Sequence, residues 1–299
     1  MSRVQADWVA VDWGTSNMRA WAMAADGSVR AEGVSAMGMG KLTRDGFEPA
    51  LLEVIGDWLD GPTTVIACGM VGSRQGWVEA PYATVPCASL PTGLAQAPTQ
   101  DARLQVHVIP GVRQMDPADV MRGEETQISG FLARNQGWDG VICLPGTHTK
   151  WVHVSAGEIV SFQTFMTGEL FQTLSTQTVL RHTVGDDGWD DAAFADGLDQ
   201  AMARPERLAA RLFSLRAGSL LQDLAPAAAR ARLSGLLIGA ELAGAKPYWL
   251  GQQIAVIGDA TLAGLYIKGL ATQSVPATQA NAKATTLAGV TAAYQRLKG

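Results

Sequence analysis

Asp12 and the turn Gly14-Thr15-Ser16-Asn17 separate two apolar, alternating segments in the stretch VAVDWGTSNMRAWAM. A phosphate loop of the P-loop or dinucleotide type needs a helix after the turn, and no helical pattern follows here. A tight turn whose N–H groups point the same way can bind an anion directly. A single carboxylate beside bound phosphates suits Mg²⁺, which keeps several waters. Asp12 is therefore a candidate metal residue, although an Asp before such a turn also commonly caps its own backbone.

A second turn of the same kind follows another apolar segment, in the stretch LPGTHTKWV. Its residues are Gly146, Thr147, His148 and Thr149, followed by Lys150. Two such turns facing each other would clamp a polyphosphate from both sides. The second stretch has Leu144 where the first has Asp12, so only the first turn carries the metal candidate. The pairing favours a nucleotide site over simple turn capping.

The segments around both turns predict the same local structure, three strands joined by tight turns. This internal repeat predicts two related domains, 1–137 and 138–299, with the last helix able to cross back to the first domain. Each domain would carry one of the two turns, the first domain the turn at Gly14 and the second the turn at Gly146.

The remaining periodicity predicts helices and strands that support these turns. Helices are expected over residues 47–59, from Asp116-Pro117 to about Asn135, and over most of the chain after Glu169. Strands are expected over 63–69, 104–112 and 253–258, the last leading through Gly258 into a helix. A closing helix is expected over 283–297. The polar, Gly- and Pro-rich stretch 69–100 is long for a connector, which indicates a binding surface.

The composition narrows the class of protein. A chain of 299 residues with 47% hydrophobic and 17% charged residues is typical of a globular protein with more than one core. The formal net charge of −5, without a basic run, argues against a nucleic-acid surface. Three dispersed cysteines indicate reduced thiols, and no apolar segment reaches a membrane span. We therefore expect a soluble, cytoplasmic protein without nucleic-acid or membrane partners.

Several segments in register resemble one kinase family. VDWGTSNMRAW, LPGTHTKWV and IGDATLAGLYIKGL are similar to the phosphate-1, phosphate-2 and adenosine segments of the actin, hexokinase and Hsp70 superfamily. GMVGSRQGWVEAPY, DVMRGEETQISG, PGTHTKW and TFMTGELF resemble the 2-keto-3-deoxygalactonate kinases, also called 2-dehydro-3-deoxygalactonokinases. The resemblance implies an α/β, two-domain actin-like ATPase fold of duplicated ribonuclease H-like type, with an inter-domain cleft. Domain 1–137 would contain the phosphate-1 turn and bind the acceptor, and domain 138–299 would contain the phosphate-2 turn and bind adenosine. It also implies MgATP-dependent phosphorylation of the sugar acid at its 6-hydroxyl, in galactonate catabolism.

The resemblance assigns roles in phosphoryl transfer. Asp12 would hold Mg²⁺, both turns would hold the phosphates, and Lys150 would add a charge unless it is an exposed rim lysine. An acidic residue on the helix near position 125 would organise metal-bound water or act as the base, so Glu125 and Glu124 are both candidates. Asp12 itself is a third candidate for the base.

The acceptor implied by the family is a carboxylate, which arginine recognises well. Arg74 is the first choice because it lies in the polar stretch, beside Ser73 and Gln75. Arg216 is the second choice for the carboxylate, and Glu169 is a candidate for a sugar hydroxyl. Adenosine would lie against Gly239, Gly258 and Asp259, although close helix packing explains such glycines equally well.

Three alternatives remain open at this level. The acceptor could be the gluconate-derived epimer, 2-keto-3-deoxygluconate. The protein could be a polyphosphate-type phosphohydrolase of the same superfamily, in which water replaces the hydroxyl. It could also be a non-catalytic sensor, although no DNA-binding motif precedes Val9. The oligomeric state is undetermined, with a homodimer as one option.

Overall fold

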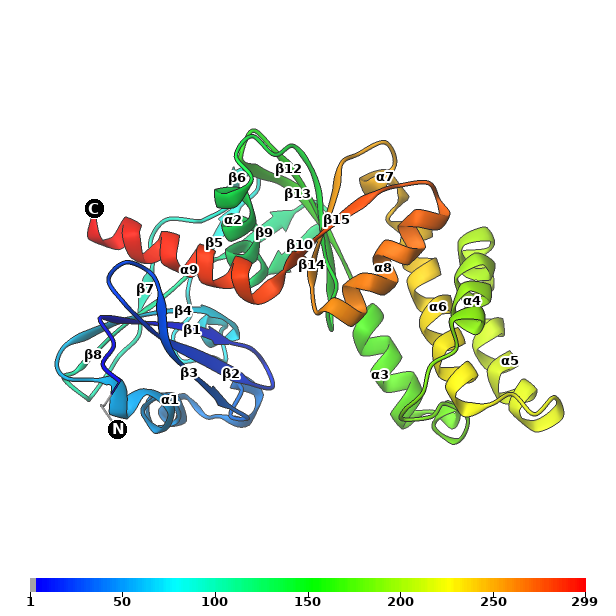
Figure 1. Cartoon of the computed structure of the whole chain (residues 1–299), viewed down its shortest axis with the longest axis horizontal. Coiled ribbons are helices and arrows are strands. Elements are labelled where there is room, and N and C mark those ends of the chain that lie inside the picture. Colours follow the sequence, from blue (N-terminus) through cyan, green and yellow to red (C-terminus); the bar gives the residue numbers. More distant parts are fainter. Residues whose placement is uncertain (1–3) are drawn as a thin grey trace. The chain divides into compact units, whose positions relative to one another are not determined.

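The computed structural model describes residues 4–299, which form two compact units (Figure 1). Unit 1 comprises the residues up to Trp138 together with Ser155–Ser161 and Ala282–Gly299. Unit 2 comprises Asp139–Val154 and Phe162–Asn281. The C-terminal helix therefore belongs with unit 1, although it follows unit 2 in the sequence. Among the described residues, no helix combines the length and the apolar character needed to cross a bilayer.

Unit 1 is built on a sheet with the strand order β3-β2-β1-β4-β8-β7. Its first three strands form antiparallel hairpins, and β4 and β8 then continue the sheet in parallel from β1. The strands are β1 (Trp8–Trp13), β2 (Met18–Met23), β3 (Val29–Ser35), β4 (Thr63–Gly69), β7 (Ala95–Gln96) and β8 (Leu104–Val108). The side chains of successive β1 residues are buried on opposite faces, because helices cover both sides of this sheet.

Helix α1 (Phe47–Ile55) covers one face, where Phe47 packs against Trp13 and Trp77. Helix α9 (Ala282–Lys298) covers the other, where Tyr294 stacks on Trp8 with ring centroids 4.2 Å apart. Because these two faces each bury aromatic side chains, the position of β1 and of the turn after it is well fixed.

Helix α2 (Glu124–Arg134) packs against α9 at two glycines. A Cβ at Gly130 would overlap the Thr285 carbonyl, and a Cβ at Gly289 would overlap the Thr126 carbonyl. The close approach of these two backbones fixes the start of α2 relative to the sheet that α9 covers.

The expected helix start at Asp116-Pro117 is wrong. These two residues join β9 (Gly111–Met115) to β10 (Ala118–Met121), which pair antiparallel and form a three-stranded sheet with β5 (Tyr82–Thr84). Asp-Pro is a good turn sequence as well as a good helix start, and the cross-strand hydrogen bonds of β9 and β10 favour the turn. Helix α2 begins only at Glu124. The short β6 (Cys87–Ala88) pairs with the first residues of β13 (Glu158–Phe165).

Unit 2 repeats the topology of unit 1, with the strand order β15-β14-β11-β12-β13. The remaining strands are β11 (Gly140–Leu144), β12 (Thr149–Ser155), β14 (Ile254–Gly258) and β15 (Ala277–Asn281). Again an antiparallel hairpin is continued by two parallel strands. Sequence reasoning missed β15, because its sequence ATQAN lacks an apolar alternation. The shared order β3-β2-β1-β4-β8 and β13-β12-β11-β14-β15 confirms the expected duplication.

Three helices of unit 2 form a layer of their own. Figure 1 shows these helices, α4, α5 and α6, lying side by side, and α6 packs closely on α4. The helices are α3 (Thr167–Gln177), α4 (Asp191–Ala203), α5 (Leu208–Leu221), α6 (Pro226–Gly244), α7 (Lys246–Trp249) and α8 (Ala260–Thr272). Helices α3, α6, α8 and α9 confirm the helical patterns expected from the sequence.

Candidate active site

The first turn, Gly14–Asn17, joins β1 to β2 and is closed by a hydrogen bond from Gly14 N–H to Asn17 O at 2.9 Å. The N–H groups of Met39 and Gly40 donate to the carbonyls of Gly14 and Thr15 at 3.0 and 2.9 Å. Thr15, Ser16 and Asn17 are exposed. The support from residues 39 and 40 therefore uses the carbonyl side of the turn. The Gly14 N–H is used within the turn and the Asn17 nitrogen lies against Gly38, so the N–H groups of Thr15 and Ser16 are left to face an anion.

Gly38 is required beside this turn. A Cβ at Gly38 would overlap the Thr15 carbonyl oxygen and the Ser16 carbonyl carbon. Because backbone atoms cannot move aside as a side chain can, only glycine fits there.

Asp12 lies at the end of β1, opposite Arg19 in the β1–β2 ladder. Burial raises the pKa of Asp12, the Arg19 charge opposes this shift and the Glu124 charge adds to it. The carboxylates of Asp12 and Glu124 are thus electrostatically coupled within unit 1.

The two glutamates at the start of α2 differ in their surroundings. The Glu125 carboxylate is fully buried and accepts the Gly123 N–H at 2.7 Å and the Thr126 hydroxyl at 3.0 Å. Burial, followed by the nearby Glu124 charge, raises the pKa of Glu125 to about 7. Glu124 is half-buried, and one of its oxygens accepts the backbone N–H of Arg122 at 3.0 Å. The Glu125 carboxylate therefore stabilises the start of the helix, and the Glu124 carboxylate is the more exposed of the two.

The described residues contain no cluster of three or more His, Cys, Asp or Glu side chains suited to a metal ion. Mg²⁺ does not need such a cluster, because it binds through one or two carboxylates, phosphate oxygens and waters. Asp12 supplies one carboxylate of this kind.

The second turn, Gly146–Thr149, joins β11 to β12 in unit 2, and its exposed part lies against the start of α3. The Glu169 N–H donates to the Thr147 carbonyl at 3.0 Å, and the Glu169 carboxylate contacts His148 Nε2 at 2.5 Å. A Cβ at Gly168 would overlap the Gly146 carbonyl oxygen. Lys150 is buried and its ammonium donates to the His148 carbonyl at 3.1 Å, so the alternative of an exposed rim lysine is wrong.

A buried hydrogen-bond network lies beneath the second turn. The Tyr266 hydroxyl donates to Glu241 at 2.7 Å and lies 3.0 Å from the Thr149 hydroxyl. The Trp151 indole N–H donates to the other Glu241 oxygen at 2.8 Å. Burial raises the pKa of Glu241 to about 7, although hydrogen bonds from Thr167, Trp151 and Tyr266 oppose the shift. The carboxyl of Glu241 thereby connects α6, α8 and the strand that leaves the second turn.

The residues expected around adenosine have structural roles in unit 2. The Asp259 carboxylate caps α8 by accepting the Thr261 N–H at 2.9 Å, directly after Gly258 at the end of β14. A Cβ at Gly239 would contact Leu198 and Ala201 of α4, so this glycine permits close packing of α6 on α4. Their roles toward adenosine stay predictions.

The residues expected around the acceptor are distributed over both units. Arg74 is largely exposed and lies 3.4 Å from Glu79, whereas Ser73 is buried and Gln75 is exposed. Arg216 lies on α5 of unit 2, with a long contact of 3.4 Å to the Thr183 hydroxyl. Their roles toward the acceptor stay predictions.

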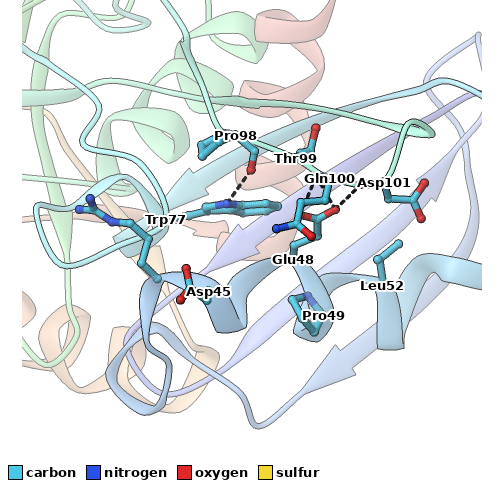
Figure 2. A pocket seen from close by; sticks show the side chains of 10 residues that line it. Asp45, Glu48, Pro49, Leu52, Trp77, Pro98, Thr99, Gln100 and Asp101 are labelled. Atoms are coloured by element: carbon cyan, nitrogen blue, oxygen red, sulfur yellow. Dashed lines mark hydrogen bonds between the residues drawn. The ribbon is translucent and has the colours of Figure 1, made fainter.

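A cavity of about 620 Å³ lies in unit 1 between α1 and the loop before β8 (Figure 2). The Glu48 carboxylate there accepts the backbone N–H groups of Gln100 and Asp101. Asp45, Glu48 and Asp101 outnumber the single Arg44 in its lining, so its charge does not favour an acidic acceptor.

Comparison with known proteins decides the family. Residues 12–293 match the family described as 2-keto-3-deoxy-galactonokinase. The chain belongs to this family. A probable 2-dehydro-3-deoxygalactonokinase of Rhizobium meliloti (strain 1021) is 39% identical, with 97% of both chains covered. A 2-dehydro-3-deoxygalactonokinase of Escherichia coli (strain K12) is 35% identical, covering 87% of this chain and 88% of that one.

Solved structures confirm the fold expected for this kinase family. A Sinorhizobium meliloti protein assigned to the same kinase has a TM-score of 0.90 at 38% identity, covering 97% of this chain and 96% of that one. The activator of 2-hydroxyisocaproyl-CoA dehydratase from Clostridium difficile, solved with bound ADPNP, has a TM-score of 0.51 at 10% identity, covering 97% of this chain and 95% of that one. The second likeness shows the fold alone. The expected actin-like α/β fold is therefore confirmed.

Two residues of this galactonokinase-family chain were missed or undervalued by sequence reasoning. Glu241 is the first, although a lone acid in the apolar run SGLLIGAEL is a signal of a buried role. Arg122 had been passed over in the segment VMRGEE, and its surroundings are described below. Nothing in the sequence distinguishes Arg122 from Arg74, because the difference lies in burial and partners.

Proposed function

We propose that this protein transfers the γ-phosphoryl group of ATP to the 6-hydroxyl of 2-dehydro-3-deoxygalactonate. The observation that carries this proposal is the first turn, whose exposed residues Thr15, Ser16 and Asn17 follow closely after the Asp12 carboxylate and whose carbonyls are held by the N–H groups of Met39 and Gly40. Membership of the 2-keto-3-deoxy-galactonokinase family supports the choice of reaction and acceptor. The three free cysteines support a location in the reducing cytoplasm.

The first and second turns would bind the ATP phosphates through backbone N–H groups and the hydroxyls of Thr15, Ser16 and Thr147. Bound Mg²⁺ would neutralise charge on the phosphates during transfer. Asp12 is the residue proposed to hold the metal, with Glu124 within its electrostatic reach.

Glu124 is the proposed general base. In the transfer step the 6-oxygen of the acceptor forms a bond to the γ-phosphorus, the bond from that phosphorus to the β–γ bridging oxygen breaks, and the hydroxyl proton passes to the Glu124 carboxylate. Glu125 is less suited to this task, because its carboxylate already accepts the Gly123 N–H and the Thr126 hydroxyl.

An ADP-release assay tests the proposal. The wild-type protein is given MgATP with 2-keto-3-deoxygalactonate, its gluconate epimer, neutral hexoses or no acceptor. We expect turnover with keto-deoxy acids and slow hydrolysis without them, since a closed site excludes water. Equal turnover without any acceptor would instead support the phosphohydrolase. Turnover with neutral hexoses alone, or no turnover with any acceptor, would contradict the proposal, and preference for the gluco epimer would change the acceptor.

A further inference from the structure

Arg122, between β10 and α2 in unit 1, is 8% exposed and has an unusual set of contacts. Its Nη2 donates to the Ala80 carbonyl at 2.8 Å, and its guanidinium lies 4.2 Å from the centre of the Tyr82 ring. Within the described chain, its Nε and Nη1 atoms are buried without a hydrogen-bond partner. Among residues 4–299, no acidic side chain forms an ion pair with it.

A second buried polar atom without a partner belongs to Ser73, which follows a residue that lies against Arg122. Ser73 is 6% exposed, and its hydroxyl forms no hydrogen bond with the residues that the structure describes. The preceding residue, Gly72, contacts Arg122, since a Cβ at Gly72 would stand 2.9 Å from Nη1. The guanidinium and the Gly72–Ser73 segment are therefore neighbours.

This arrangement is costly without a further partner. An arginine side chain keeps its charge in a protein, and burying it without an anion is strongly unfavourable. The Tyr82 ring and one carbonyl compensate part of this cost, but neither carries a formal negative charge. Each buried donor without an acceptor adds a further penalty. An anionic oxygen ligand would satisfy the guanidinium, and the Ser73 hydroxyl, one residue beyond Gly72, is a second buried donor without a partner.

We propose that Arg122, assisted by the Ser73 hydroxyl, binds the carboxylate of the sugar-acid acceptor; this inference rests on the proposed function. Arg74 is less suited because it is largely exposed and already close to Glu79. The unpartnered atoms are shielded from solvent in this structure, so the acceptor must displace part of the segment 73–82 to reach them. An ATP phosphate is the other source of anionic oxygen, and the experiment separates the two.

The test measures steady-state kinetics of Arg122→Met, Arg122→Lys and Ser73→Ala with both substrates varied. Hydrogen bonds to charged groups are worth roughly 10- to 100-fold in binding, so kcat/KM for the acid should fall by about that factor in Arg122→Met. KM for ATP should stay within about twofold, and Arg122→Lys should recover part of the loss. Arg113→Met is the matched control, since Arg113 is an exposed arginine on β9 of the same sheet, where it contacts the Thr84 hydroxyl.

A carboxamide analogue of the acceptor distinguishes binding from a structural role. The wild type should lose about 10- to 100-fold in kcat/KM on this analogue, whereas Arg122→Met should lose little more, since its partner is already absent. Equal further loss in Arg122→Met would overturn the inference, as would a change confined to ATP. If Arg122→Met does not fold, the same comparison is made with Arg122→Lys and Ser73→Ala. The inference would be overturned if both variants lost as much kcat/KM on the carboxamide analogue as the wild type does.

These outcomes are distinct from failure of the proposed function. Wild-type protein that does not phosphorylate the acid removes both conclusions. Suppose instead that the wild type phosphorylates the acid, that Arg122→Met has unchanged kinetics toward the acid, and that a crystal structure shows a buried water on Nη1. In that case only the assignment of Arg122 fails.

Discussion

The first turn of unit 1 and the second turn of unit 2 have the same place in duplicated sheets, but they are supported differently. Backbone N–H groups of Met39 and Gly40 hold the first turn. The second turn has one such backbone bond, from Glu169 N–H to the Thr147 carbonyl, but it is also held by side chains. These are the Glu169 carboxylate on His148 and the Thr149, Tyr266 and Glu241 network beneath the turn. Backbone support at the first turn leaves Asp12 available for chemistry. At the second turn Leu144 takes the corresponding place, and the nearby acid, Glu241, is used for support.

The largest effect expected from this comparison concerns Asp12 and Leu144. Asp12→Asn should lower kcat by on the order of 100-fold or more, because a charge that stabilises the metal and the transferring phosphoryl group is lost. Leu144→Asn, at the corresponding place in unit 2, should lower stability without a comparable loss of kcat in the folded fraction. Kinetics at several Mg²⁺ concentrations, with thermal midpoints, measure both.

Glu124→Gln provides the contrasting catalytic variant. Loss of the proposed base should lower kcat by about 100-fold without shifting the Mg²⁺ concentration at half-maximal rate. Asp12→Asn should shift that concentration upward. If the two variants exchange these behaviours, the roles of the two carboxylates must be exchanged too.

The next effect concerns stability against pH. Each unit contains a buried carboxyl whose pKa is raised to about 7, Glu125 in unit 1 and Glu241 in unit 2. Such a group binds its proton more tightly when folded, so its stabilisation is complete below its unfolded pKa of about 4.5 and is lost as pH rises through 7. A shift of this size corresponds to about 3 kcal/mol at most for each group.

Denaturant unfolding from pH 4.5 to 8 measures this dependence, with Glu241→Gln as the matched variant. The lowered pKa of His107 acts in the opposite direction, and subtracting the variant's profile from that of the wild type removes it. The difference should favour the wild type at low pH and diminish toward pH 8. A difference that is flat across this range would show that Glu241 is ionised with an ordinary pKa.

The sequence was sufficient for some of these features and insufficient for others. The alternation around Asp12 and around Gly146 predicted both hairpins, because a strand's burial pattern is local. Asp116-Pro117 was misassigned because a helix start and a turn use the same residues. The roles of Glu241 and Arg122 could not be predicted, since each depends on partners far away in the sequence: Trp151 for the former, and Ala80 for the latter.

A smaller effect concerns the glycines beside the two turns, which allow neighbouring backbone to approach each turn closely. Gly38→Ala beside the first turn and Gly168→Ala beside the second would each force a methyl group onto a backbone carbonyl. Each should lower the free energy of unfolding by about 1–3 kcal/mol, as overpacking does, and raise KM for ATP. Gly146→Ala is the control for the loss of stability alone, since nothing lies within 4 Å of its Cβ position but the residue belongs to the turn proposed to bind phosphate. A loss in Gly146→Ala as large as in Gly168→Ala would show that backbone freedom, not close approach, limits the second turn.

The smallest effect isolates one hydrogen bond beneath the second turn. Thr149→Val keeps the shape of the side chain but removes the hydroxyl that lies 3.0 Å from the Tyr266 hydroxyl. Tyr266 still donates to Glu241, so the loss should be about 1 kcal/mol of stability and a few-fold increase in KM for ATP, with kcat nearly unchanged. Tyr266→Phe removes both contacts and should cost more. In a double-mutant cycle the two changes should be less than additive, because they share one hydrogen bond; full additivity would mean that Thr149 and Tyr266 support the turn independently.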